Sequence, residues 1–282
     1  MDTIAITTLV ITVIGILVGA GLVFAGRKFH VEIDEREGAV RGCLPGNNCG
    51  ACGFAGCDAL AAAIAKGEAE VNACPVGGAP AAEKIAAIMG VEAGVTERNT
   101  AFVRCAGTCD VTKNQGNYVG VKDCRSAVLS GLNLTECAYG CLGFGSCTEV
   151  CPENAIRCEN GVALVDRSRC VGCGLCVKAC PRGLITLIPA ANRIAVRCSN
   201  RDRGPMVKKV CSAGCIGCML CTKQCETGSV TVTANLASID YGTCTQCGKC
   251  AEKCPVGIIT QYASCGKADG SDPGKEPEEP KA

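Results

Sequence analysis

The sequence predicts an α+β protein with a single N-terminal transmembrane helix, followed by a small helical domain and two tandem cysteine-rich units. Three observations predict this organisation. The N-terminus carries an uncharged apolar run, 28 of the 282 residues are cysteine, and the blocks 137–180 and 211–254 repeat one another. Aromatic residues make up only 3% of the chain, so we expect metal–thiolate bonds to help hold the segments together.

The apolar run extends from Ile4 to Ala25 without a charged residue. A helix of this length spans about 33 Å, enough to cross the hydrocarbon core of a bilayer. A cleaved signal peptide is the alternative, but it would carry positive charge before the apolar run, whereas Arg27 and Lys28 follow it. We therefore expect residues 1–28 to be a single-pass anchor in the cell membrane, with the N-terminus outside and the bulk of the chain in the cytoplasm.

Composition excludes several classes of protein. The net charge of +1 provides no basic field for nucleic acid, so no nucleic-acid partner is expected. The chain has one histidine, which argues against imidazole-rich zinc sites and against a Cys–His hydrolase. A reducing cytoplasm argues against structural disulfides. The cysteines are therefore expected to bind metal.

The strongest motif lies near the C-terminus, where four cysteines follow the spacing C-x2-C-x2-C-x3-C before Pro255. An upstream run has the same spacing, with Glu226 in the place of the proline. Two such runs in tandem resemble the bacterial two-cluster ferredoxin, in which three close thiolates bind one [4Fe–4S] cluster and the fourth binds the other. The sequence thus predicts a ferredoxin-like domain over 201–265. One cluster is assigned to Cys215, Cys218, Cys221 and Cys254, and another to Cys225, Cys244, Cys247 and Cys250.

A second ferredoxin-like domain is predicted over 136–200. Its later run is regular and ends at Pro181, but its earlier run has the spacing C-x3-C-x5-C-x3-C. Phe144 occupies the place of the usual middle cysteine, and Cys137 is the natural replacement. One cluster is assigned to Cys137, Cys141, Cys147 and Cys180, and another to Cys151, Cys170, Cys173 and Cys176.

Structural zinc is the alternative for these motifs. Zinc sites use isolated sets of four thiolates, usually two CxxC pairs that are well apart. Four runs that close on Cys-Pro or its equivalent fit iron–sulfur clusters better. In addition, β-prone segments at 162–165, 230–232 and 237–239 separate the cysteine groups.

A different motif follows the anchor, within a domain predicted over 29–100 that binds one [4Fe–4S] cluster. Alanine-rich stretches at 58–70 and 79–89 predict helices there. The segment LPGNNCGACGFAGC, together with the anchor and the ferredoxin-type repeats, resembles the B subunit of the Rnf complex. The resemblance covers nearly the whole chain and is to the clostridial type with an extra ferredoxin domain. The cluster cysteines that it implies in this domain are Cys49, Cys52, Cys57 and Cys74.

Rnf is a membrane-bound ferredoxin:NAD oxidoreductase that couples electron flow to sodium or proton translocation. The resemblance implies an electron-relay subunit that takes electrons from reduced soluble ferredoxin and passes them to membrane and flavin subunits. The sequence has no nucleotide-binding fingerprint, so hydride chemistry is expected in another subunit. Two alternatives stay open. One is an anchored polyferredoxin of a hydrogenase or other reductase, and the other is a corrinoid-linked iron–sulfur component.

Five [4Fe–4S] clusters would use 20 of the 28 cysteines. A sixth site is open in the intermediate segment 101–135, where Cys105, Cys109 and Cys124 could be completed by Cys198 or Cys211. The alternative is that these are buried or free thiols. Cys43, Cys158 and Cys265 receive no role. The charged, proline-rich tail over 266–282 is predicted to be disordered.

Overall fold

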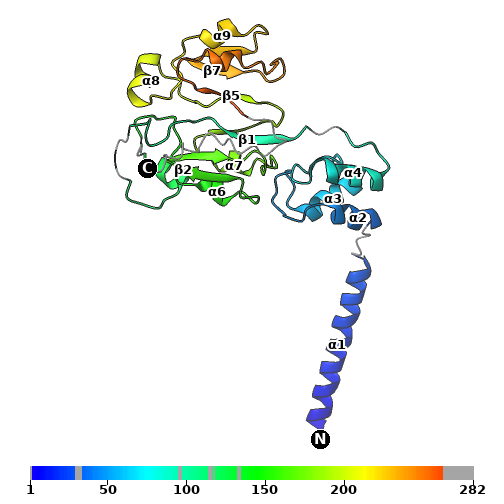
Figure 1. Ribbon diagram of the computed structural model, residues 1–282. Coiled ribbons are helices and arrows are strands. Elements are labelled where there is room, and N and C mark those ends of the chain that lie inside the picture. Colours follow the sequence, from blue (N-terminus) through cyan, green and yellow to red (C-terminus); the bar gives the residue numbers. More distant parts are fainter. Residues whose placement is uncertain are drawn as a thin grey trace, which may run out of the picture.

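A computed structural model describes residues 2–28, 34–94, 97–113, 116, 118–131 and 135–262. It contains a long N-terminal helix, a small helical domain and two α+β units (Figure 1). Cys265 and the predicted disordered tail over 266–282 lie outside the described residues.

Helix α1 (Asp2–Lys28) stands away from the rest of the protein in Figure 1. Its stretch Ile6–Phe24 has a mean hydropathy of 2.5, and none of it is buried inside the protein. Leu9, Leu17 and Phe24 are examples of its large apolar side chains that are exposed. By length and composition, α1 is therefore a candidate membrane span.

The small helical domain consists of α2 (Glu35–Cys43), α3 (Cys57–Ala65) and α4 (Gly78–Met89), with α3 and α4 both packed against α2. Helix α3 ends before the predicted limit at residue 70, because the chain turns at Gly67 with a positive φ of 76°. The centre of this domain is aliphatic. Its most deeply buried side chains are Val40, Leu60, Ile64 and Ile85.

Each α+β unit contains one tight β-hairpin. The first pairs β2 (Ile156–Glu159) with β3 (Val162–Val165), and the second pairs β6 (Val230–Thr233) with β7 (Leu236–Ile239). In both hairpins the two turn residues have positive φ, which matches the twist of the flanking strands. The β-prone segments predicted from the sequence therefore lie in these hairpins.

Each unit also has an outer pair formed by its first and last strands. Strand β1 (Asn99–Val103) runs antiparallel to β4 (Ile185–Pro189), and β5 (Ile194–Val196) runs antiparallel to β8 (Ile259–Gln261). The order of strands is thus the same in the two units. The shared strand order agrees with the repeat between the two cysteine-rich blocks of the sequence.

The outer strands do not follow the expected domain limits. The expected limit between residues 100 and 101 falls inside β1, which pairs with a strand of the first unit. The limit between residues 200 and 201 assigns β5 to the first unit, whereas its partner β8 lies in the second. Short strands whose partners lie more than 60 residues away leave no periodic signal that would mark such limits.

Six short helices complete the two units: α5 (Cys124–Leu129), α6 (Ser146–Glu149), α7 (Leu175–Ala179), α8 (Gly204–Val210), α9 (Leu220–Gln224) and α10 (Lys249–Glu252). Helices α6 and α7 contact each other in the first unit, as α9 and α10 do in the second.

The outer strand pairs of the two units meet at an apolar junction. Phe102, Ile188 and Ala195 are buried there. The rings of Phe102 and Tyr262 meet edge to face, with centroids 5.9 Å apart and an interplanar angle of 84°. The junction therefore holds the two units together through apolar contacts.

Candidate iron–sulfur sites

Four hollows in the α+β units are each lined by at least four cysteines. All four have the same kind of lining, thiols among largely apolar side chains, so one class of group would suit all four. Within the described ranges, no three Cys, His, Asp or Glu side chains form a group that could hold a single metal ion. The thiols instead surround spaces lined largely by apolar side chains.

The Cys215 hollow lies in the second unit. Four thiols line it together with apolar residues such as Val232, Ala237 and Ile259. The set includes the distant Cys254, which the crossed ferredoxin pattern requires. The structure thus brings together one complete predicted set: Cys215, Cys218, Cys221 and Cys254.

The Cys151 hollow has the same construction in the first unit. Backbone N–H groups of Ala101 and Ala155 donate to the sulfurs of Cys170 and Cys151, both at 3.3 Å. Burial raises the pKa of Cys176 to about 12, and the neighbouring thiols of the set add to the effect. This hollow also contains one complete predicted set: Cys151, Cys170, Cys173 and Cys176.

The remaining predicted set of the second unit is joined by side-chain contacts. Burial raises the pKa of Cys250 to about 11, and the nearby thiols of Cys244 and Cys247 raise it further. Cys225 is linked to the same region by a chain of hydroxyl groups. Its sulfur lies 3.5 Å from Oγ1 of Thr227, and the chain continues through Ser229 to Thr243, the neighbour of Cys244. An ion pair also joins Glu226 to Lys249.

The Cys141 hollow departs from the predicted grouping. Cys141, Cys147 and Cys180 line it as expected, but Cys137 does not. Cys124 takes its place. The structure therefore brings Cys124 together with three of the four predicted ligands, Cys141, Cys147 and Cys180. Cys158 also lines this hollow, and its thiol is hydrogen-bonded to that of Cys147.

Local hydrogen bonds explain the position of Cys124. Asp123 caps the N-terminus of α5 by accepting from the backbone N–H of Ser126 at 2.8 Å. The same carboxylate accepts from the hydroxyl of Ser146 at 2.7 Å, and that hydroxyl oxygen accepts from the N–H of Cys124 at 2.8 Å. These bonds tie Cys124 to the start of α6, next to Cys147. Spacing along the chain could not reveal this contact.

The Cys105 hollow lies between the two units. Its thiols come from Cys105, Cys137, Cys198 and Cys211. The sequence-based sixth site shares only some of these residues, because Cys124 lines the Cys141 hollow and Cys109 is exposed. A signal for the pairing of Cys105 with Cys198 does exist in the sequence, since AFVRCAG at 101–107 resembles IAVRCSN at 194–200.

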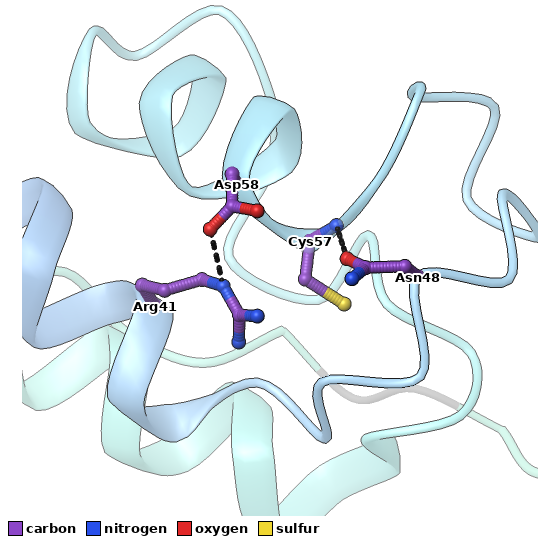
Figure 2. A network of polar contacts seen from close by, with 4 residues as sticks. All are labelled: Arg41, Asn48, Cys57 and Asp58. Carbon is purple, nitrogen blue, oxygen red and sulfur yellow. Dashed lines mark hydrogen bonds and ion pairs between the residues drawn. The ribbon is translucent and has the colours of Figure 1, made fainter.

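In the helical domain, Cys57 is the first residue of α3 (Figure 2). Its N–H donates to Oδ1 of Asn48 at 2.8 Å, and Nε of Arg41 donates to Oδ1 of Asp58 at 2.6 Å. The sulfur of Cys74 accepts from the N–H of Gly77 at 3.3 Å. Burial raises the pKa of Cys74, and the thiols of Cys52 and Cys57 act in the same direction. Three predicted ligands, Cys52, Cys57 and Cys74, are therefore close together.

Comparisons with known families agree with this interpretation of the cysteines. Residues 44–76 match a family described as a putative Fe-S cluster. Residues 141–155 and 163–186 each match a 4Fe-4S binding domain, and residues 214–258 match a 4Fe-4S dicluster domain. Cys105, Cys124, Cys137, Cys198 and Cys211 fall outside all of these matched ranges.

Similarity to individual proteins extends over most of the chain. The B subunit of the Na⁺-translocating ferredoxin:NAD⁺ oxidoreductase complex of Acetobacterium woodii is 44% identical over 84% of this chain and 72% of the relative. The chain belongs to the Rnf B-subunit family. The B subunit of the proton-translocating ferredoxin:NAD⁺ oxidoreductase complex of Clostridium ljungdahlii is 41% identical over 86% of this chain and 87% of the relative. The B subunit of an ion-translocating oxidoreductase complex of Methanosarcina acetivorans is 40% identical over 82% and 88%, respectively.

Membership of the Rnf B-subunit family explains two features of the structure. Membrane complexes of this family account for the long apolar helix α1. Iron–sulfur domains account for the Cys151 and Cys215 hollows. The donor set fits iron–sulfur clusters, because such clusters are held by thiolates whose sulfurs accept backbone hydrogen bonds.

Proposed function

We propose that the chain is the membrane-anchored electron-relay subunit of an ion-translocating ferredoxin:NAD⁺ oxidoreductase complex, and that it takes electrons from reduced soluble ferredoxin. The observation that carries this function is the repeated grouping of four thiols around a hollow in a member of the Rnf B-subunit family. Bound [4Fe–4S] clusters would supply one-electron transfer. The chain thus acts within an oxidoreductase without chemistry on a substrate of its own.

Five sets of cysteines would hold these clusters. They are the predicted sets with one change: Cys124, which was predicted for the sixth site, replaces Cys137. In the helical domain the set is Cys49, Cys52, Cys57 and Cys74. In the first unit the sets are Cys124, Cys141, Cys147 and Cys180, and Cys151, Cys170, Cys173 and Cys176. In the second unit they are Cys215, Cys218, Cys221 and Cys254, and Cys225, Cys244, Cys247 and Cys250.

The protein around each set has two physical roles. Apolar side chains exclude water from the hollows, as Val232 and Ile259 do beside Cys254. Backbone N–H groups donate to the sulfurs, as that of Leu184 does to Cys180 at 3.4 Å. Such hydrogen bonds stabilise thiolate charge and influence the reduction potential.

The arrangement in the membrane completes the proposal. Arg27 and Lys28 would lie on the cytoplasmic side, so the α+β units would reach soluble ferredoxin there. Ferredoxin would dock on the C-terminal unit, which is farthest in sequence from the anchor. Membrane and flavin subunits of the complex would receive the electrons.

The function is tested by replacing Cys247 or Cys250 with Ser in the assembled complex and measuring oxidation of reduced ferredoxin. We expect the rate to fall strongly, with Cys109→Ser as the matched control because Cys109 is exposed and belongs to none of the five sets. An unchanged rate in the Cys247 and Cys250 variants would show that ferredoxin delivers electrons elsewhere.

A further inference from the structure

Four buried thiols meet where the two α+β units join. Cys105 and Cys198 each stand two residues after the first strand of a unit, β1 and β5 respectively. Cys137 comes from the segment between β1 and α6, and Cys211 directly follows α8. Cys105, Cys137 and Cys198 are each 7% exposed, and Cys211 is 8% exposed. All four line one hollow, as the predicted cluster sets do in the Cys151 and Cys215 hollows.

Every one of these sulfurs accepts a hydrogen bond. Cys105 accepts from the N–H groups of Gly107 and Cys141, both at 3.4 Å. Cys198 accepts from the N–H groups of Asn200 and Cys215, also at 3.4 Å. Two backbone donors on each sulfur are the pattern that stabilises a thiolate ligand.

Side chains provide the donors to the other two sulfurs. Nδ2 of Asn200 lies 3.5 Å from the sulfur of Cys137, and Oγ1 of Thr112 lies 3.7 Å from that of Cys211. Arg104 and Arg197 also line the hollow and bring positive charge to it. Since a cluster with four thiolates carries net negative charge, this environment favours its binding.

We propose that Cys105, Cys137, Cys198 and Cys211 bind a sixth [4Fe–4S] cluster at the junction of the two units. The repeated tripeptide Val-Arg-Cys, at 103–105 and 196–198, delivers one ligand from the equivalent position of each unit. Cys211 forms a β-bridge with Thr112, and the N–H of Glu136, next to Cys137, donates to the carbonyl of Lys113, next to Thr112. Both units are therefore needed to complete the site.

The position of this site links the other hollows. The N–H of Cys141 that bonds Cys105 belongs to a residue of the Cys141 hollow, and the N–H of Cys215 that bonds Cys198 belongs to the Cys215 hollow. The sixth site thus lies between a predicted cluster of the first unit and one of the second. Its role as a link between the units rests on the proposed relay function, whereas cluster binding itself does not.

The first measurement is iron, acid-labile sulfide and zinc in the full chain after anaerobic purification. Six clusters correspond to about 24 iron atoms and about 24 sulfides per chain, and five correspond to about 20 of each. A content of about 20 iron atoms per chain would overturn the sixth site and leave the relay function standing. The same conclusion would hold if one zinc atom per chain were found with them, because the sixth site would then bind zinc and no cluster. A chain without iron would overturn both proposals.

The second measurement assigns the cluster to its ligands. The double variant Cys198→Ala/Cys211→Ala is expected to lose about four iron atoms and four sulfides, whereas Cys109→Ala loses none. Retention of all iron in the double variant would refute the assignment. Thr112→Val serves if the double variant fails to fold, because it removes only the hydroxyl donor to Cys211. It is expected to lower the midpoint potential of one cluster at unchanged iron content, and unchanged potentials throughout would count against the site.

Discussion

The thiol of Cys49 in the helical domain lies within electrostatic range of that of Cys173 in the first α+β unit. The pKa of Cys173 is raised mainly by burial, but the charges of neighbouring thiols, including Cys49, contribute. In Figure 1 the helical domain lies beside the unit that contains α7, and Cys173 lies two residues before this helix begins. A predicted ligand of the helical domain therefore lies near a predicted ligand of the next cluster.

The proximity of Cys49 to Cys173 leads to a prediction about electron flow. Replacing Cys173 with Ala in the assembled complex should leave the cluster of the helical domain oxidised when reduced ferredoxin is added, because its neighbour is lost. Electron paramagnetic resonance after rapid freezing would measure this. Cys43→Ala is the control, since Cys43 packs in the same helical domain without a predicted ligand role. Reduction at the normal rate in the Cys173 variant would mean that electrons reach the helical domain by another route.

The revised grouping around the Cys141 hollow predicts that Cys124→Ala and Cys137→Ala disturb different clusters. Each variant should lose about four iron atoms, but the lost spectral signals should differ. Loss of iron in the double variant Cys124→Ala/Cys137→Ala should be the sum of the two single losses. Identical spectral changes in the single variants would contradict the revised grouping, because they would place Cys124 and Cys137 on the same cluster. Cys158→Ala, which alters a thiol beside Cys147, should retain all iron.

The sequence predicts what regular spacing encodes. The C-x2-C-x2-C-x3-C runs lead to the Cys215 and Cys151 hollows, because three of the thiols lie within one short loop. Spacing does not reveal which of Cys124 and Cys137 lines the Cys141 hollow. Their positions depend on contacts between distant residues, such as the hydrogen bond from Ser146 to Asp123, 23 residues apart. The pairing of strand β1 could not be predicted for the same reason, since its partner β4 lies more than 80 residues later in the sequence.

Asn48 is expected to stabilise the helical domain by capping α3 from a distance. Gly56 at the N-cap has no side chain, so Oδ1 of Asn48 accepts the N–H of Cys57 instead (Figure 2). Asn48→Ala should lower the free energy of unfolding by about 1–2 kcal/mol. Urea titration followed by cluster absorbance would measure the change. Asp58→Ala, which breaks the exposed pair with Arg41, should have a smaller effect, and an equal effect would contradict the capping role.

Gly172 and Gly183 form a matched pair that tests close packing at the Cys151 hollow. Both have positive φ, 70° and 59°, so alanine costs about 1–2 kcal/mol of backbone strain at either position. A Cβ at Gly172 would also lie 2.3 Å from the carbonyl oxygen of Asn99 in β1, whereas a Cβ at Gly183 meets nothing within 4 Å. Gly172→Ala should therefore lose about four iron atoms per chain and Gly183→Ala should keep them. Equal iron contents in the two variants would show that β1 can move enough to accommodate the added methyl group.

Removal of iron should unfold the two α+β units before the helical domain. The described strands form four separate two-stranded sheets, and such hairpins are only marginally stable alone. Their cores also contain thiols, including Cys170 and Cys221, in place of large apolar side chains. Cluster binding is therefore expected to supply much of their folding free energy.

The helical domain depends less on metal, because its hydrogen bonds are local and Leu60, Ile64 and Ile85 are at most 1% exposed. Limited proteolysis of the full chain after anaerobic chelation would measure the order of unfolding. A protected fragment that spans residues 34–94 should outlast fragments of residues 135–262. Simultaneous cleavage throughout would mean that the cluster of the helical domain also governs its folding. Resistance of residues 135–262 without iron would show instead that apolar contacts such as Phe102 against Tyr262 suffice to hold the units.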